Sequence, residues 1–280
     1  MDKKVRIISD SNMFPFLGQL QEYPNFLKHP IEVTDYGQVY QSISKEVKSF
    51  LDIVWTSPEK ILPSFNAAYQ LRDVPHQQVI AEVEEYIDLL LRHCKSDYVF
   101  VSSWALPEHS KGYGILDWKE GIGLTNLLMK CNLKIAEKLE PHDNFFMFDV
   151  QRLLSDAANP VNHKLWYATK VPYSIEVFQI AAKQMSATLD AINGKSKRLI
   201  VLDLDNTIWG GVVGENGWQH LRLGGHDHIG EAFKHFQSEL KALTNRGVQL
   251  ALASKNDLDV ALEAIENHPE MILTKDDFCA

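Results

Sequence analysis

The sequence has few of the features that are typical of secreted proteins, membrane proteins or proteins with a structural metal site. Its three cysteines, Cys94, Cys131 and Cys279, lie far apart and in no metal-ligand spacing. We expect them to be buried or partly buried free thiols in a reducing cytoplasm. The N-terminus lacks the apolar stretch and small-residue cleavage site of a signal peptide, and no apolar run approaches the length of a membrane span. We therefore expect a cytoplasmic protein with no membrane partner.

The sequence also lacks a run of basic residues, and its formal net charge is −9. An acidic surface repels phosphate backbones, which argues against a nucleic-acid partner. The 45% apolar and 23% charged residues are typical of an ordinary globular protein. A chain of 280 residues is more naturally two domains than one.

Strand-like and helix-like segments alternate in the first part of the chain. Short runs rich in Val, Ile and aromatic residues occur at 5–9, 31–34, 51–55, 98–102 and 144–150. Helical patterns between them are clearest at 76–91 and 124–139. Such alternation predicts a parallel sheet covered on both faces by helices. We expect a domain over 1–170, followed by a connecting helix and linker over 171–195.

A second alternation fills residues 196–280. The pattern predicts strands at 198–202 and 248–253, helices at 229–245 and 258–267, and a third strand at 271–274. The predicted fold class is therefore α/β, with two Rossmann-like three-layer domains whose sheets are mainly parallel.

Two carboxylates follow the strand predicted at 198–202. Asp203 and Asp205 lie in the string LDLDNT at 202–207, at the strand end where open α/β sheets bind ligands. Alternation along an extended strand would point them in opposite directions, so we expect the backbone to turn here. Two acidic groups this close repel each other, and a divalent cation relieves that cost. Phosphate chemistry needs the same groups: a carboxylate nucleophile, an acid–base group and a cation.

The next predicted strand ends in three polar residues. Ser254, Lys255 and Asn256 supply a hydroxyl, an ammonium and an amide, all able to donate to phosphate oxygens. Adjacent parallel strands would place Ser254 beside Asp203. The two aspartates could instead only cap a turn, but two apolar strands that both end in polar groups favour a phosphate site.

These strings resemble known motifs. Asp203-x-Asp205-x-Thr207, followed by a strand ending in Ser254, resembles the first two motifs of the haloacid dehalogenase (HAD) superfamily. The longer DLDNTIWGGVVGE at 203–215 with SKN at 254–256 resembles the narrower FkbH-like family. WYATK at 166–170 and YGQVY at 36–40 extend the resemblance over most of the chain.

The resemblance implies a role for each matching residue. Asp203 would attack phosphorus and form an aspartyl-phosphate, while Asp205 would protonate the leaving group and then help water attack. Mg²⁺ would be held by the Asp203 carboxylate and the Asp205 backbone carbonyl. Four further residues would contact the phosphate or orient its loop: Asn206, Thr207, Ser254 and Lys255.

HAD enzymes also use a later lysine and further acidic residues. In FkbH-like proteins these residues come after a segment that is similar to residues 271–273 of this chain. Lys275, Asp276 and Asp277 come too soon after that segment, so we expect them in a solvated loop. We therefore expect the HAD core to lack its last portion, which leaves the activity of this fragment open. The string HDH at 226–228, beside two glycines, indicates an exposed loop rather than a second metal site.

The string SDSN at 9–12 resembles the Gly-Asp-Ser block of SGNH hydrolases, with serine in place of glycine. A hydrolase would need Ser11 as nucleophile, an oxyanion donor such as Asn126 or Asn132, and a histidine such as His163. His163 lacks the Asp-x-x-His spacing of that family. A degenerate SGNH-like domain, used for binding or as a lid, is favoured over a working serine site.

The predicted function is Mg²⁺-dependent phosphatase activity in a biosynthetic pathway, on a phosphorylated small molecule or a carrier-bound substrate. Two alternatives stay open. Some FkbH-like proteins transfer a glyceryl group to an acyl carrier protein, an activity associated with a cysteine in the nucleophile motif, where this chain has Leu204. The other alternative is a non-catalytic phosphate-binding module.

Overall fold

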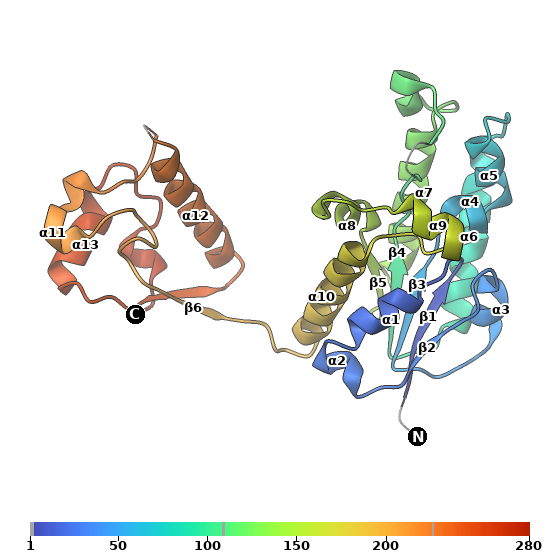
Figure 1. Cartoon of the computed structure of the whole chain (residues 1–280), viewed down its shortest axis with the longest axis horizontal. Coiled ribbons are helices and arrows are strands. Elements are labelled where there is room, and N and C mark those ends of the chain that lie inside the picture. The colour runs from blue at the N-terminus through green and yellow to red at the C-terminus, as the bar shows by residue number, and fades with distance from the viewer. Residues whose placement is uncertain (1–2, 108–109, 226) are drawn as a thin grey trace. The chain divides into compact units, whose positions relative to one another are not determined.

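A computed structural model describes residues 3–107, 110–225 and 227–280. The chain divides into two units, Met1–Asn193 and Gly194–Ala280 (Figure 1). In both units the strands that pair are parallel. The fold is therefore α/β with parallel sheets, as predicted.

The first unit is built on a five-stranded sheet with the strand order β2-β1-β3-β4-β5. Its strands are β1 (Val5–Ser9), β2 (Ile31–Val33), β3 (Leu51–Trp55), β4 (Tyr98–Ser102) and β5 (Phe145–Phe148). Every residue of β1 and β3 is buried. These strands are mainly apolar, and the buried side chains of Arg6 and Asp52 pair with each other at 2.6 Å. Such strands suit central positions, because helices cover both of their faces.

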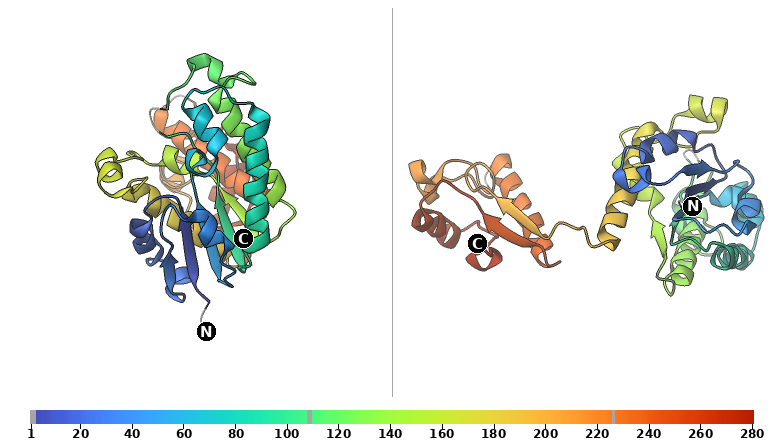
Figure 2. Two further views of the ribbon diagram at one scale, coloured as in Figure 1. Left: turned by 90° about the vertical axis from the view of Figure 1, so that its right-hand side faces the viewer. Right: turned by 90° about the horizontal axis from the view of Figure 1, so that it is seen from below.

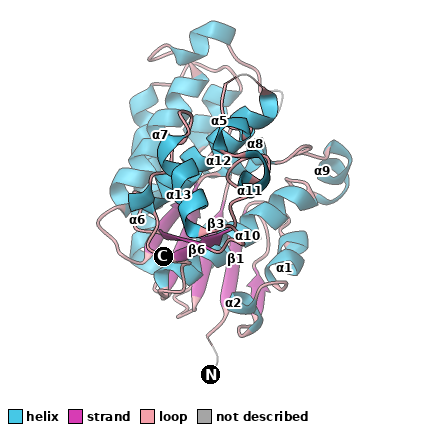
Figure 3. Ribbon diagram, turned by 90° about the vertical axis from the view of Figure 1, so that its left-hand side faces the viewer, coloured by secondary structure: helices cyan, strands magenta, loops and turns pink. Residues whose placement is uncertain are grey.

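Helices flank this sheet on both sides (Figure 3). They are α1 (Phe14–Leu20), α2 (Pro24–Leu27), α3 (Val39–Ser44), α4 (Pro58–Ile61), α5 (Pro63–Tyr69), α6 (His76–His93), α7 (Leu124–Leu139), α8 (Val150–Asp156), α9 (His163–Thr169) and α10 (Ile175–Ile192), with the 3-10 turn η1 (Gly114–Trp118). Ile8 joins the core beneath α6 and α7, whereas its neighbour Ile7 joins the core beneath α1 and α10. Side-chain alternation along each strand thus supplies both cores of a three-layer unit.

Helix α10, which we expected to connect the domains, belongs to the first unit. Val177 and Phe178 are fully buried, and Phe178 packs against the rings of Phe16 and Trp55. The linker is therefore shorter than expected: residues 194–198 connect the end of α10 to the next strand, which begins at Leu199.

The second unit has two parallel strands, β6 (Leu199–Leu202) and β7 (Gln249–Leu252), paired from Leu199↔Gln249 to Leu202↔Leu252. Its helices are α11 (Val213–Asn216), α12 (His228–Thr244) and α13 (Leu258–Asn267), with 3-10 turns η2 (Trp218–His220) and η3 (Lys275–Asp277) (Figure 2). Residues of α12 and α13 share a core with Leu202 and Leu250. This packing leaves the carboxyl ends of both strands accessible to a ligand.

The third strand predicted at 271–274 is wrong. Those residues form no strand, and the N–H of Leu273 donates to the side chain of Gln237 instead. Parallel pairing with β7 starts later, where Cys279 N–H donates to the Leu250 carbonyl at 2.8 Å. The segment at 271–274 is apolar because it packs into the core, with Leu273 fully buried.

The expectation of buried or partly buried thiols is confirmed for two cysteines and is wrong for Cys279. Cys94 and Cys131 are buried, and burial raises the pKa of both thiols to about 12, whereas Cys279 is exposed. Among the described residues, no helix combines the length and the apolar character needed to cross a bilayer.

Candidate functional site

A turn after β6 separates the two aspartates. Asp203 directly follows the strand and is exposed, and its Oδ1 accepts a hydrogen bond from the N–H of Leu204 at 2.8 Å. Asn206 takes a left-handed conformation with φ 57°, and Thr207 N–H donates back to the Leu204 carbonyl. Leu204 is fully buried. The turn therefore anchors the loop in the core while leaving Asp203 open to solvent, as the spacing predicted.

The carboxylate of Asp205 is held by three N–H donors. Its Oδ1 accepts from the indole of Trp209 at 3.0 Å and from the backbone of Val213 at 3.1 Å. Its Oδ2 accepts from the side-chain amide of Asn256 at 2.8 Å. Desolvation by itself favours the neutral acid, but these hydrogen bonds outweigh it and lower the pKa of Asp205 below its ordinary value. Asp205 is thus a half-buried carboxylate of fixed orientation.

The loop after β7 reaches the same edge of the sheet. Ala253 N–H donates to the last carbonyl of β6 at 2.8 Å, which extends the pairing to where the polar residues begin. The Asn256 amide that contacts Asp205 also lies 3.2 Å from Ser254 Oγ. Ser254 and Lys255 are exposed. Asn256 therefore joins the two loops, a role different from the phosphate contact that its amide suggested.

A short hairpin follows the aspartate loop. Gly210 and Arg222 exchange two backbone hydrogen bonds, of 3.0 and 2.8 Å. A Cβ on Gly210 would lie 3.0 Å from the ring of Phe233, so a larger residue would disturb this contact. The N–H of Gly211 donates to Asn206 Oδ1 at 2.9 Å. The oxygen of Asn206 thus supports the loop, and only its amide nitrogen is left to face a ligand.

The late acidic residues lie away from this site. Asp277 accepts a hydrogen bond from Thr274 N–H at 2.8 Å and an ion pair from Lys241. It belongs to η3, which precedes the parallel pairing with β7. The amino ends of parallel strands lie at one end of the sheet and their carboxyl ends at the other. The residues of η3 (Lys275, Asp276 and Asp277) are therefore at the amino end, opposite the carboxyl end that carries Asp203.

The aspartate loop could supply oxygen donors for a cation. They are the Asp203 carboxylate and the backbone carbonyl of Asp205. Within the described part of the chain, no three His, Cys, Asp or Glu side chains are grouped so that they could hold a metal. Mg²⁺ commonly keeps several waters and binds through one or two carboxylates together with substrate phosphate. The donor set therefore fits Mg²⁺ completed by water and phosphate, and does not fit a closed structural site.

Ser11 lies at the carboxyl edge of the first unit's sheet, where the structure does not reproduce a serine-hydrolase arrangement. Its Oγ donates to Asp10 at 2.7 Å and accepts from Lys60 Nζ at 2.7 Å. Asn126 and Asn132, the candidate oxyanion donors, both donate to backbone carbonyls of the same unit. The Ser11 hydroxyl is thus hydrogen-bonded to both members of the Lys60–Asp10 ion pair. The two candidate oxyanion donors stabilise the backbone of the first unit instead.

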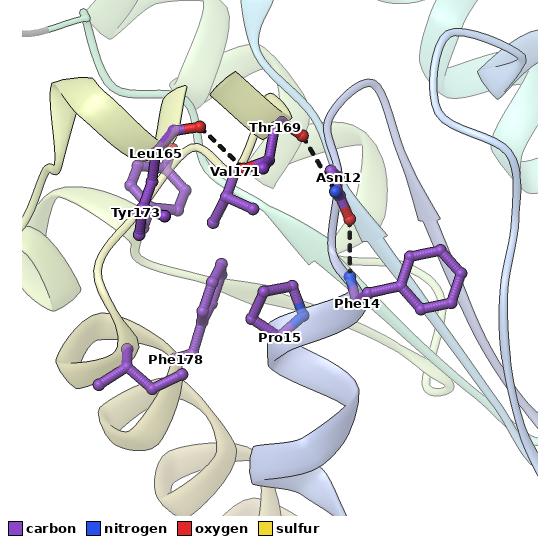
Figure 4. A pocket seen from close by; sticks show the side chains of 9 residues that line it. Asn12, Phe14, Pro15, Leu165, Thr169, Val171, Tyr173 and Phe178 are labelled. Atoms are coloured by element: carbon purple, nitrogen blue, oxygen red, sulfur yellow. Dashed lines mark hydrogen bonds between the residues drawn. The ribbon is translucent and has the colours of Figure 1, made fainter. Parts of the chain in front are cut away.

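An apolar cavity of about 280 Å³ lies in the first unit, with Asn12 at its rim (Figure 4). Val171, Tyr173 and Phe178 supply part of its wall, and α9, which begins at His163, supplies another part. Asn12 at its rim is satisfied, because its amide donates to the Thr169 carbonyl and accepts from Phe14 N–H. All lining residues belong to the first unit, so this cavity is not the site formed by the aspartates.

None of the three donors to Asp205 was predicted. A backbone N–H such as that of Val213 leaves no trace in a sequence. Trp209 was taken only as part of a motif, yet it is fully buried. A buried indole needs a hydrogen-bond acceptor, and an aspartate four residues earlier across a tight turn is a signal that could have suggested the pair.

No family model matches the chain, and no curated protein matches it. The N-terminal part of protein BF1531 from Bacteroides fragilis, which contains a phosphatase domain and was crystallised with Mg, matches 99% of this chain and 75% of its own, at 26% identity and a TM-score of 0.85. The chain shares the fold of that protein.

Two more distant structures resemble the chain only weakly. A protein of the lipolytic G-D-S-L family from Desulfitobacterium hafniense is 14% identical over 66% of this chain and 99% of its own, with a TM-score of 0.36. A peptidoglycan O-acetylesterase is 11% identical over 60% of this chain and 49% of its own, with a TM-score of 0.35. Likenesses this weak carry no argument about function.

Proposed function

We propose that the second unit is a Mg²⁺-dependent phosphatase domain of the HAD type with Asp203 as its nucleophile. The observation that carries the proposal is the division of the two aspartates, one exposed and one held by three N–H donors. A turn cap would not require donors from two separate loops around Asp205. The likeness to a protein with a phosphatase domain, crystallised with Mg, supports the same chemistry.

In the first step, the exposed carboxylate of Asp203 attacks the phosphorus of a phosphate ester or acyl phosphate. The bond from phosphorus to the leaving oxygen breaks, and an aspartyl-phosphate forms. Because its N–H donors favour the charged form, Asp205 must receive a proton with the substrate, from the bound phosphate monoanion, and it then gives that proton to the leaving oxygen. The Ser254 hydroxyl and the Lys255 ammonium, both exposed after β7, bind oxygens of the transferring group.

In the second step, water attacks phosphorus and the bond to Asp203 breaks, which releases phosphate. The carboxylate of Asp205 takes the proton of that water. The N–H groups of Trp209 and Asn256 keep this carboxylate in one orientation, as general base catalysis requires. Mg²⁺, held by the Asp203 carboxylate and the Asp205 carbonyl when bound, would screen the negative charges of phosphate and aspartate.

The substrate we assign is a phosphorylated small molecule or a carrier-bound phosphate, used in a biosynthetic pathway of the cytoplasm. Glyceryl transfer to an acyl carrier protein is the less favoured reaction. It is associated with a thiol at the position of Leu204, and here that side chain is fully buried in the core. Phosphate release to water needs no such thiol.

The test is Mg²⁺-dependent release of phosphate from para-nitrophenyl phosphate by the whole chain. We expect turnover by the wild type and by Asp276→Asn, an acid of η3 away from the site. Asp203→Asn should lower kcat by at least about 10³-fold, because the nucleophile is lost. Equal turnover by Asp203→Asn would contradict the assigned nucleophile. No turnover by the wild type would leave phosphate binding without catalysis.

A further inference from the structure

An arm of the first unit presents large apolar side chains to water. This arm, residues 113–133, comprises η1, the loop after it and the first part of α7, and it rises above the rest of the unit (Figure 1). Seven of its side chains are between 45% and 92% exposed: Tyr113, Ile115, Leu116, Trp118, Ile122, Met129 and Leu133. Single exposed apolar residues are ordinary, but a group of this size marks an interaction surface.

The arm is held in shape by its own hydrogen bonds. The N–H of Tyr113 donates to Asp117 Oδ1 at 3.0 Å, and the Asn126 amide donates to the Trp118 carbonyl at 3.3 Å. A Cβ on Gly123 would lie 2.0 Å from the carbonyl oxygen of Asp117, so only glycine permits this approach. The exposed side chains are therefore carried by a defined turn.

The turn and the helix form one surface. The hydrogen bond from Asn126 to Trp118 holds the end of η1 against α7, one helical turn before Met129. Met129 and Leu133 are four residues apart and so are neighbours on the outer face of α7. Lys130, beside this face, is neutralised by an ion pair with Glu120. The apolar strip is therefore continuous, and its flanking charge is balanced within the arm.

We propose that this strip packs against the same strip of a second copy of the chain across a twofold axis. The exposed fractions together equal about four fully exposed large side chains, or roughly 800 Å² at about 200 Å² each. A stable interface buries about 800 Å² per partner, so the strip has the area that a dimer needs. A twofold axis sets any patch against itself, so no second complementary surface is required.

The charges of the arm favour a second copy over a membrane. Within the arm, Lys119 and Lys130 balance Asp117 and Glu120, so two arms meet without the repulsion that a net charge of −9 would otherwise produce. Anionic membranes attract segments with an excess of Lys and Arg. The arm has no such excess, and its apolar residues extend along a helix face as a dimer contact would.

The test is sedimentation velocity of the full chain between about 1 and about 100 µM, a range that covers micromolar dissociation constants. Trp118→Lys places a charge in the strip, where the side chain is 62% exposed. Leu27→Lys, at a position 64% exposed on α2, is the matched control. We expect the wild type and Leu27→Lys to dimerise alike, and Trp118→Lys to dimerise at least about tenfold more weakly. Equal melting temperatures would show that both variants fold.

Three outcomes would overturn the proposal. The first is a wild-type chain that stays monomeric at every concentration. The second is a dimer that Trp118→Lys leaves unchanged, because its interface would then lie elsewhere. The third is a monomer that floats with phosphatidylcholine vesicles unless Trp118 is replaced by Lys, because the strip would then be a membrane contact.

Discussion

At the scale of single residues, the site depends on the atoms that hold Asp205 in place. Its carboxylate receives donors from its own loop and, through Asn256, from the loop after β7. Asn256 also lies within hydrogen-bond distance of Ser254. One amide thus sets the spacing between Asp205, the proposed acid–base group, and Ser254, the proposed phosphate contact.

Asn256→Ala tests this role. We expect kcat/KM for Mg²⁺-dependent phosphate release to fall by about 10–100-fold, the usual effect of losing a residue that orients a catalytic group. Asn267→Ala is the control, because the amide of Asn267, the last residue of α13, donates to the Glu263 carbonyl of the same helix. Wild-type kinetics in Asn256→Ala would show that Asp205 does not need this amide.

The position of the aspartates could be predicted because a buried strand is recognised in a sequence as an apolar run, and ligands bind at the carboxyl ends of such strands. The direction of side-chain hydrogen bonds could not, because it depends on how two loops cross in space. Asn256 was therefore named only as able to donate to phosphate, and its amide contacts Asp205. The error at 271–274 has a related cause, since an apolar run shows burial but not the conformation that produces it.

At the scale of elements, α12 links the aspartate loop to the segment 272–273, which precedes η3. Gln237 is fully buried on this helix. Its Nε2 donates to the Ile208 carbonyl at 2.8 Å, and its Oε1 accepts from the N–H groups of Ile272 at 3.0 Å and Leu273 at 3.2 Å. Three backbone groups thus depend on one side chain.

Gln237→Leu should lower the free energy of unfolding by about 3 kcal/mol, because each buried backbone group left without a partner costs about 1–3 kcal/mol. Urea unfolding of the whole chain, followed by tryptophan fluorescence, measures the change. Ser238→Ala is the control, since Ser238 is exposed and bonds only within its own helix. A loss for Gln237→Leu no larger than for Ser238→Ala would contradict this role of Gln237.

The start of α12 gives the second unit an acid-sensitive contact. Asp227 caps the helix by accepting from the N–H groups of Ile229 and Gly230, and it pairs with Arg222 at 2.8 Å. The hydrogen bond from Arg222 is the main cause that lowers the pKa of Asp227 to about 2, and the helix N–H groups add to it against desolvation. A carboxylate with a lowered folded-state pKa stabilises the fold above its ordinary pKa of about 4. That contribution is lost as pH falls through about 2.

Asp227→Asn should therefore lower the urea midpoint at neutral pH and weaken its dependence on pH between about 4 and about 2. Midpoints measured across this range for both proteins test the expectation. Parallel curves for wild type and variant would mean that Asp227 is not the group that titrates.

At the scale of the whole molecule, the chain divides at Asn193 into units with separate cores. The first unit has its sheet covered on both faces, with α10 completing one layer. A unit with a complete core of its own is expected to fold alone.

Residues 1–193, produced by themselves, should show helical circular dichroism and one cooperative thermal transition. Limited trypsin digestion of the full chain should cut first within 194–198, which contains Lys195, Lys197 and Arg198. An unfolded 1–193 fragment would show that its stability depends on the second unit.

The central claim, that Asp203 carries a phosphoryl group during turnover, is tested most directly by trapping that intermediate. The enzyme is quenched in acid while it turns over an aryl phosphate with Mg²⁺, and its peptides are mapped by mass spectrometry. We predict a phosphoryl group on Asp203 that hydroxylamine removes and that Asp203→Asn lacks. A phosphoryl group on Ser254, or steady release of phosphate with Asp203 never modified, would contradict the account.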